Sequence, residues 1–126
     1  MDLIEIIKQD YARFPQAQTY SIYAQNVHFR DPVYDFYGID RYQKMIKFIT
    51  TWFRQLKLEL HSIEQTDRII KTTWTMSWEA PLPWNPPVSV SGWTELKLDQ
   101  ADKICAHYDY WNCTKWDLVR QHFKLA

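Results

Sequence analysis

The sequence predicts an α+β fold in which N-terminal helices close one face of a curved, cone-shaped antiparallel sheet of about four strands, with a short C-terminal helix. Apolar side chains recur at helical spacing through residues 2–14 and 40–56. Large apolar and polar side chains alternate through much of residues 57–111, which is the period of a strand. The chain of 126 residues has the length of one domain, so we expect residues 1–126 to form a single domain.

Two segments near the N-terminus have helical patterns. Asp2 and Glu5 form a capping-box pattern at the start of the first segment, and Pro15 follows its end. A second, shorter helix is predicted over residues 19–26, with a short extended piece at residues 27–30 after it.

A long helix is predicted to run from Asp40 to about Leu56. Gln43 completes a second capping-box pattern with Asp40. Phe48 and Trp52 widen the apolar stripe beyond the width that one neighbouring helix would cover. We therefore expect this helix to lie across a sheet.

Polar breaks divide the strand region into four. Residues 64–68 and 99–103 are predicted turns, and four prolines make residues 81–87 a stiff connection. Because these connections leave no room for crossover helices, the four strands must pair antiparallel. Thr114 and Asp117 form a third capping pattern, which begins the C-terminal helix. The apolar face expected for that helix consists of Trp116, Val119 and Phe123.

Charge, glycine and cysteine content exclude several classes of function. The chain has 15 basic and 15 acidic side chains, so no overall field draws it to nucleic acid or to a membrane surface. Gly38 and Gly92 stand too far apart to form a glycine-rich phosphate loop. Cys105 and Cys113 fit reduced thiols in the cytoplasm better than a zinc site or a disulfide framework. We expect no nucleic-acid partner, no membrane partner, no metal and no cofactor.

Two strings of residues carry a resemblance to a known family. The string VHFRDP at residues 27–32 leads through Tyr37 and Gly38 into the long helix, and a late strand is KICAHYDYW at residues 103–111. With this order of elements, the chain resembles the nuclear transport factor 2-like superfamily, which includes the polyketide-cyclase-like (SnoaL-like) and ketosteroid-isomerase-like proteins. Within it, the chain is most similar to an uncharacterised group from cyanobacteria and plants. The resemblance implies the cystatin-like roll, with an apolar pocket beneath the long helix.

Strand parity predicts which side chains face that pocket. Residues two apart share a face of a strand, and the resemblance places His107, Asp109 and Trp111 inside. Burying Asp109 among aromatic rings is costly unless the carboxyl is hydrogen-bonded or protonated, and His107 can supply a partner. The expected ligand-binding side chains are Trp74, Met76, Trp78, Thr94 and Trp111.

The resemblance also implies catalytic roles. In ketosteroid-isomerase-like members, the aspartate of a matching Asp-Pro pair is the base that moves a proton on carbon, which implies this role for Asp31. Tyr11 stands roughly where those enzymes keep an oxyanion-stabilising tyrosine. Thr94 occupies the place of their protonated acid, and a hydroxyl is a weaker donor, which argues against steroid-isomerase-like chemistry. The candidate catalytic residues are Asp31, Asp109, His107 and Tyr11.

The same residues have structural interpretations. Asp before Pro is a common start of a loop, which would explain Asp31 without catalysis. His107 and Asp109 can form a hydrogen-bonded couple that only sets strand register. With His122, they would also match the two-histidine, one-carboxylate set that holds ferrous iron.

The predicted function is binding of a small apolar molecule in an aromatic-lined pocket, with proton transfer of an isomerase or cyclase kind on that molecule. The alternative is a non-catalytic, homodimeric docking or scaffold module. Parity places Trp93, Tyr108 and Tyr110 on the outer face of the sheet, where an aromatic patch usually meets another chain. Because the resemblance also implies dimers formed through the sheet, we expect a homodimer through these residues.

Overall fold

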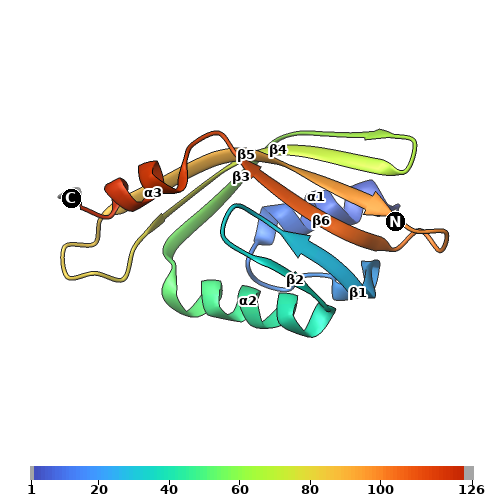
Figure 1. Cartoon of the computed structure of the whole chain (residues 1–126), viewed down its shortest axis with the longest axis horizontal. Helices are drawn as coiled ribbons and strands as arrows, with labels where there is room; N and C mark the ends of the chain where they lie inside the picture. The colour runs from blue at the N-terminus through green and yellow to red at the C-terminus, as the bar shows by residue number, and fades with distance from the viewer. Residues whose placement is uncertain (1, 124–126) are drawn as a thin grey trace.

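The computed structural model describes residues 2–123 and has the predicted α+β architecture (Figure 1). The helices are α1 (Leu3–Arg13), the single-turn 3-10 helix η1 (Tyr20–Ile22), α2 (Ile39–Trp52) and α3 (Lys115–Gln121). The strands are β1 (Tyr23–Arg30), β2 (Asp35–Tyr37), β3 (Arg54–Thr66), β4 (Ile69–Glu79), β5 (Pro87–Leu98) and β6 (Ile104–Trp111). None of the helices in the described range combines the length and the apolar character needed to cross a bilayer.

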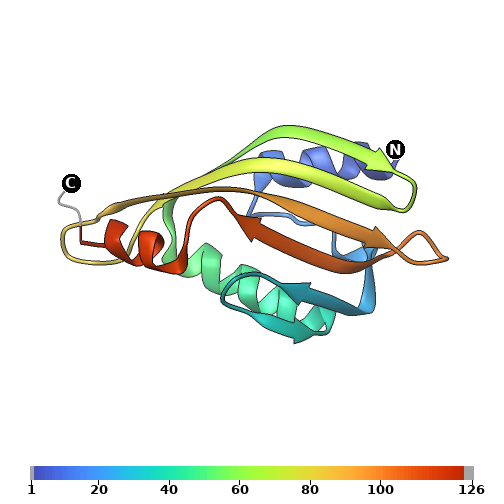
Figure 2. The ribbon, with the colours of Figure 1, turned by 45° about the horizontal axis from the view of Figure 1, so that its top comes forward.

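The strands form one six-stranded sheet in the order β2-β1-β6-β5-β4-β3. The four strands predicted from the alternating region pair antiparallel, as expected. The sheet has two more strands than the alternation indicated, because β2 pairs antiparallel with β1, and β1 pairs parallel with β6. Figures 1 and 2 show the sheet curving around α1 and α2, which cover the same face.

The prediction of a helix over residues 19–26 is wrong beyond Ile22. Only one 3-10 turn forms there, and β1 then begins at Tyr23, which is aligned with Ile104 in the parallel ladder with β6. The hydrogen bonds of that ladder replace those of a helix, so tertiary pairing overrides a weak local helical pattern.

The long helix α2 differs from its prediction at both ends. Its N-cap is Gly38, with a φ of 111°, so the predicted capping box of Asp40 and Gln43 does not form. A positive φ of this size suits glycine, which has no Cβ. The helix ends at Trp52, and the chain then enters β3, so residues 54–56 join the sheet.

The terminal helices begin where the capping patterns predicted. The Asp2 carboxylate accepts a hydrogen bond of 2.8 Å from the Glu5 N–H, and Thr114 and Asp117 form a complete capping box at α3. The predicted apolar face of α3 is wrong, because Trp116 is 72% exposed. Leu118 packs on the core instead, and at 100° per residue it points away from Trp116. The other two members of the predicted face, Val119 and Phe123, are also exposed.

Two apolar clusters lie on the covered face of the sheet. One joins α1, α2, β1 and the middle strands around Ile7, Phe29 and Ile46. The other gathers around Trp74 and Trp78 on β4. The tyrosine of α1 that was predicted to face the pocket packs against both clusters.

Candidate functional site

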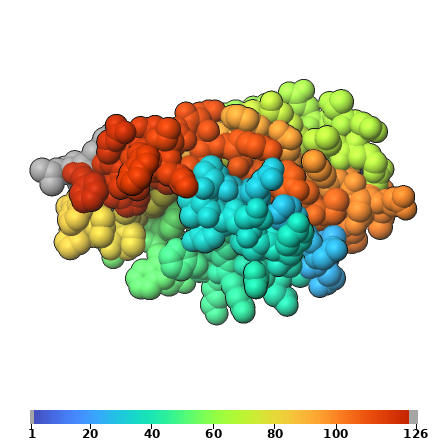
Figure 3. Space-filling model, in the orientation of Figure 1, coloured from blue at the N-terminus to red at the C-terminus, as the bar shows by residue number. Residues whose placement is uncertain are grey.

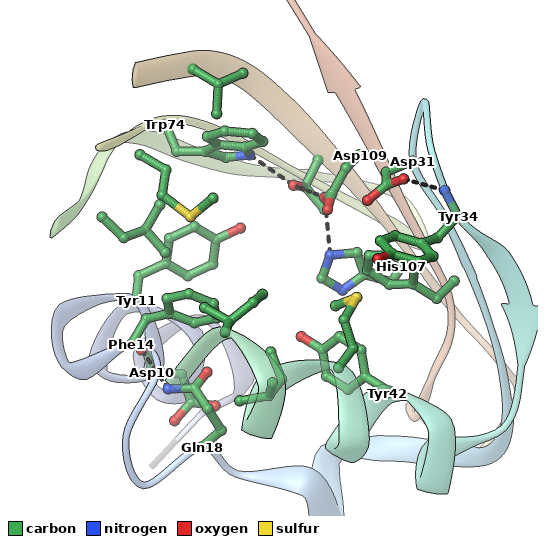
Figure 4. A pocket seen from close by; sticks show the side chains of 18 of the residues that line it. Asp10, Tyr11, Phe14, Gln18, Asp31, Tyr34, Tyr42, Trp74, His107 and Asp109 are labelled. Atoms are coloured by element: carbon green, nitrogen blue, oxygen red, sulfur yellow. Dashed lines mark hydrogen bonds and ion pairs between the residues drawn. The ribbon is translucent and has the colours of Figure 1, made fainter. Parts of the chain in front are cut away.

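A cavity of about 310 Å³ lies between the covered face of the sheet and the helices α1 and α2 (Figure 4). Its wall is mainly apolar and aromatic, with a few converging polar groups, which is the usual composition of a small-molecule site. Every residue predicted for the site lines this cavity: Tyr11, Asp31, Trp74, Met76, Trp78, Thr94, His107, Asp109 and Trp111.

A chain of hydrogen bonds crosses three strands in the cavity wall (Figure 4). The indole N–H of Trp74 donates to Thr94 Oγ1 at 2.8 Å. The Thr94 hydroxyl donates to Asp109 Oδ1 at 2.6 Å, and His107 Nε2 lies 3.0 Å from the same oxygen. An indole can only donate, so the single proton of Thr94 is committed to the carboxylate. Thr94 therefore orients Asp109 and has no proton left to donate to a ligand.

The second nitrogen of His107 has no hydrogen-bond partner among residues 2–123. Because Nε2 faces the Asp109 carboxylate, the proton of the neutral ring lies on Nε2, and Nδ1 carries a lone pair. Nδ1 is buried and unpaired among the described residues, with the rings of Phe29 and Tyr42 centred 4.9 and 5.5 Å from the imidazole. An unsatisfied buried nitrogen costs free energy, so Nδ1 is an acceptor that a bound molecule would satisfy.

Asp31 lies in the turn after β1 and lines the cavity. One of its carboxyl oxygens is hydrogen-bonded within the turn. Its Oδ1 accepts the backbone N–H groups of Val33 at 2.7 Å and Tyr34 at 2.6 Å, as the loop interpretation predicted. Its Oδ2 accepts no hydrogen bond from the described residues. Burial raises the pKa of the carboxyl, although the two N–H groups lower it.

This raised pKa makes stability depend on pH. The folded chain binds the Asp31 proton more tightly than the unfolded chain, so the contribution favours folding in acid and is lost as pH rises through the raised pKa. Asp31→Asn should therefore melt at a higher temperature than the wild type at neutral pH, and the two should converge below the ordinary pKa of 3.8. Thermal melts across pH measure this, with Glu64→Gln, an acid-to-amide change at an exposed position outside the cavity, as control. A lower melting temperature of Asp31→Asn at neutral pH would contradict it.

Three tyrosines bring hydroxyl groups to the cavity. Tyr11 from α1 lies 2.7 Å from Thr72 Oγ1, and burial raises its pKa to about 12, so the phenol stays protonated at neutral pH. Tyr23 and Tyr42 were not predicted as site residues, and their hydroxyl oxygens are 3.5 Å apart. Burial raises the pKa of both. One sequence feature could have indicated Tyr42: it places a hydroxyl group in the otherwise apolar stripe of the long helix.

The iron site considered from the sequence is not assembled. His122 follows α3, and its Nδ1 donates to the Leu118 carbonyl at 2.9 Å. Within residues 2–123, no three His, Cys, Asp or Glu side chains lie close enough to hold a metal ion together.

The opposite face of the sheet carries the aromatic residues assigned to it by parity. Trp93 and Tyr110 stack with ring centroids 5.1 Å apart. Lys71 lies 5.7 Å from the Trp93 ring, and Arg30 lies 4.3 Å from the ring of Tyr108, so cations cover part of this surface.

Sequence comparison adds the family. Residues 1–107 match the family model described as "Uncharacterized conserved protein (DUF2358)". The chain belongs to the DUF2358 family. No curated protein matches this DUF2358 chain in sequence.

Solved structures show that the DUF2358 protein has the NTF2-like, ketosteroid isomerase-like fold. An NTF2-like protein of unknown function from Burkholderia pseudomallei is 11% identical, with 96% of this chain and 97% of that chain covered and a TM-score of 0.77. A ketosteroid isomerase-like protein from Catenulispora acidiphila, in complex with trimethylamine, is 10% identical, with 94% and 92% covered and a TM-score of 0.75. An LEH-like epoxide hydrolase from M. tuberculosis is 11% identical, with 94% and 84% covered and a TM-score of 0.69. The resemblance inferred from the sequence is confirmed at the level of the fold.

Proposed function

We propose that this DUF2358 protein binds a small, largely apolar molecule in the cavity and transfers a proton to or from it through His107. The observation that carries the proposal is the buried Nδ1 of His107, which is unpaired among the described residues and belongs to a ring whose other nitrogen lies 3.0 Å from Asp109 Oδ1. A carboxylate on the far nitrogen orients an imidazole and stabilises its protonated form, which is the arrangement of a general base.

The reaction that fits this wall is proton abstraction from a carbon next to a carbonyl group. Nδ1 takes the proton, the electron pair of the C–H bond moves onto the carbonyl oxygen, and the Asp109 carboxylate balances the imidazolium. With the Thr72 hydroxyl donating to the Tyr11 oxygen, the proton of the Tyr11 phenol is free to form a hydrogen bond to that carbonyl oxygen. Return of the proton to another atom of the same molecule completes an isomerisation, with Asp31 as a second acid or base. In a cyclisation, the enolate carbon first bonds to a second carbonyl carbon of the same molecule, the electron pair of that C=O bond moves to its oxygen, and this oxygen takes the proton.

The structural relatives support ligand binding more than any one reaction. One of them was solved with trimethylamine and another is an epoxide hydrolase, so the fold accommodates small molecules in other chains. At identities of 10% and 11%, these relatives carry no residue roles over to this chain.

Ligand binding can be tested with hydrophobic carbonyl compounds such as acetophenone. We expect acetophenone to raise the melting temperature of the wild type, because it binds only the folded state. Leu58→Trp should abolish the shift, because Leu58 lines the cavity and the larger side chain would fill it. Leu60→Trp is the matched control, since Leu60 shares that face of β3 without lining the cavity, and it should keep the shift. No shift with any such compound would contradict the proposal.

The second candidate is a homodimeric docking module that uses the outer sheet face, and the stacked pair of Trp93 and Tyr110 favours it. Tyr108 would lie in the same interface. Replacing Trp93 and Tyr110 together by glutamine should convert a dimer into a monomer in analytical ultracentrifugation. Trp116→Gln, which removes a more exposed aromatic residue from α3, is the control. A dimer that survives the double replacement would argue against this interface.

Two further proposals concern the group of proteins to which the chain belongs and its location in the cell. We propose that the chain belongs to the cyanobacterial and plant group and is related to the SnoaL-like proteins. The basis is the two sequence strings at residues 27–32 and 103–111. We propose the cytoplasm as the location, because Cys105 and Cys113 are free thiols.

A further inference from the structure

A shallower groove of about 270 Å³ adjoins the cavity. Its lining consists of Tyr34, Phe36, Arg41, Lys44, Met45 and Phe48. Three of these, Tyr34, Met45 and Phe48, also line the cavity, so groove and cavity meet along them. Tyr34 is 49% exposed and Phe48 is 53% exposed, which makes them a shared rim at the surface. Figure 3 shows this side of the molecule, where β2 in cyan and α2 in green lie side by side.

Groove and cavity carry opposite charges. The charged residues of the groove are Arg41 and Lys44, both exposed on α2. Within residues 2–123, no lysine or arginine lines the cavity, and the acidic residues that line it are Asp10, Asp31 and Asp109.

Asp10 is already neutralised within the protein. Arg13 lies 3.0 Å from its Oδ1, and the Thr19 hydroxyl and backbone N–H donate to its two oxygens. Asp31 and Asp109 each keep an Oδ2 that accepts no hydrogen bond from the described residues. Figure 4 shows these two carboxyls on the same side of the cavity as His107.

These charges determine how a charged ligand would be oriented. An anionic group inside the cavity would lose its hydration and face two carboxylates in a medium of low dielectric constant. In the groove, the same group would stay hydrated and face two cations. An apolar chain gains by entering the cavity, whose wall is mainly apolar.

We propose that the ligand is an amphipathic anion whose apolar chain enters the cavity while its anionic group stays in the groove against Arg41 and Lys44. This inference rests on the proposed function, which has the cavity hold a ligand, and it adds the chemical class and orientation of that ligand. The rim residues Tyr34, Met45 and Phe48 then contact the first carbons of the chain.

Three ligands with the same chain test the charge: octanoate, octanol and octylamine. In titration calorimetry at low ionic strength, we expect octanoate to bind most tightly and octylamine most weakly.

The double variant Arg41→Gln/Lys44→Gln should weaken octanoate binding about threefold or more and leave octanol binding unchanged. Added salt should weaken octanoate binding only, since the contacts are exposed. The matched control is Lys8→Gln/Lys47→Gln, which removes two exposed cations that line neither the cavity nor the groove.

The outcomes separate this inference from the proposed function. Equal binding of octanoate and octanol, or a double variant that binds octanoate normally, would overturn the inference while the cavity still holds a ligand. Tightest binding of octylamine would also overturn it, because the carboxylates of the cavity would then set the preference. If neither these compounds nor carbonyl compounds bind at all, the proposed function itself fails.

Discussion

Gly92→Ala should lower the free energy of unfolding by about 3 kcal/mol, the upper part of the usual range for overpacking. Gly92 lies in β5, directly opposite Trp111 of β6. A Cβ added there would collide with the backbone carbonyl oxygen of Tyr110, and this group cannot move aside because it belongs to the sheet. Glycine within a strand often marks such a close approach of two backbones. Chemical denaturation of the variant and the wild type measures the loss.

Ser89→Ala is the matched control for this substitution. Ser89 lies on the same strand, its side chain is exposed, and its hydrogen bonds with Gln121 use the backbone. The control should change the free energy of unfolding by less than about 0.5 kcal/mol. A Gly92→Ala variant as stable as this control would show that β5 and β6 do not approach as described.

His107→Phe should slow proton transfer about a hundredfold, the lower part of the range for general base catalysis. The assay is exchange of the methyl hydrogens of acetophenone for deuterium, followed by NMR in heavy water. Phenylalanine keeps an aromatic ring against Phe29 and Tyr42, so binding of acetophenone should change little. The variant therefore separates loss of the base from loss of the cavity.

His61→Phe makes the same substitution outside the cavity, on an exposed position of β3 where the imidazole contacts Thr75. It should exchange at the wild-type rate. If His107→Phe also exchanges at that rate while it still binds acetophenone, His107 is not the base, and the Oδ2 of Asp31 becomes the candidate.

Local patterns predicted the parts of the fold that depend on neighbouring residues. The capping side chains of Asp2 and Thr114 form the predicted hydrogen bonds, because a cap involves only the next turn of the chain. Alternation in β4 predicted that Trp74 and Trp78 share a face, because parity follows from strand geometry alone.

The errors lie where distant residues compete with local preference. Tyr23 begins a strand because β6, some eighty residues later, offers a ladder beside it. On α3, one leucine packs on the core and turns Trp116 to the solvent, which the helical period alone could not indicate. In both places, hydrogen bonding or burial against a remote element outweighs a small difference in propensity.

For the site, the sequence by itself determined that Trp74, Met76 and Trp78 share one face, because side chains alternate across a strand whatever the strand packs against. The resemblance placed His107 and Asp109 inside, and Tyr42 was not predicted. Only the tertiary structure decided what those residues can do. The path from Trp74 through Thr94 to Asp109 and His107 joins β4, β5 and β6, and among the described residues it leaves Nδ1 of His107 without a partner. Hydrogen-bond direction and burial are properties of atoms brought together from distant parts of the chain, so no local pattern of residues encodes them.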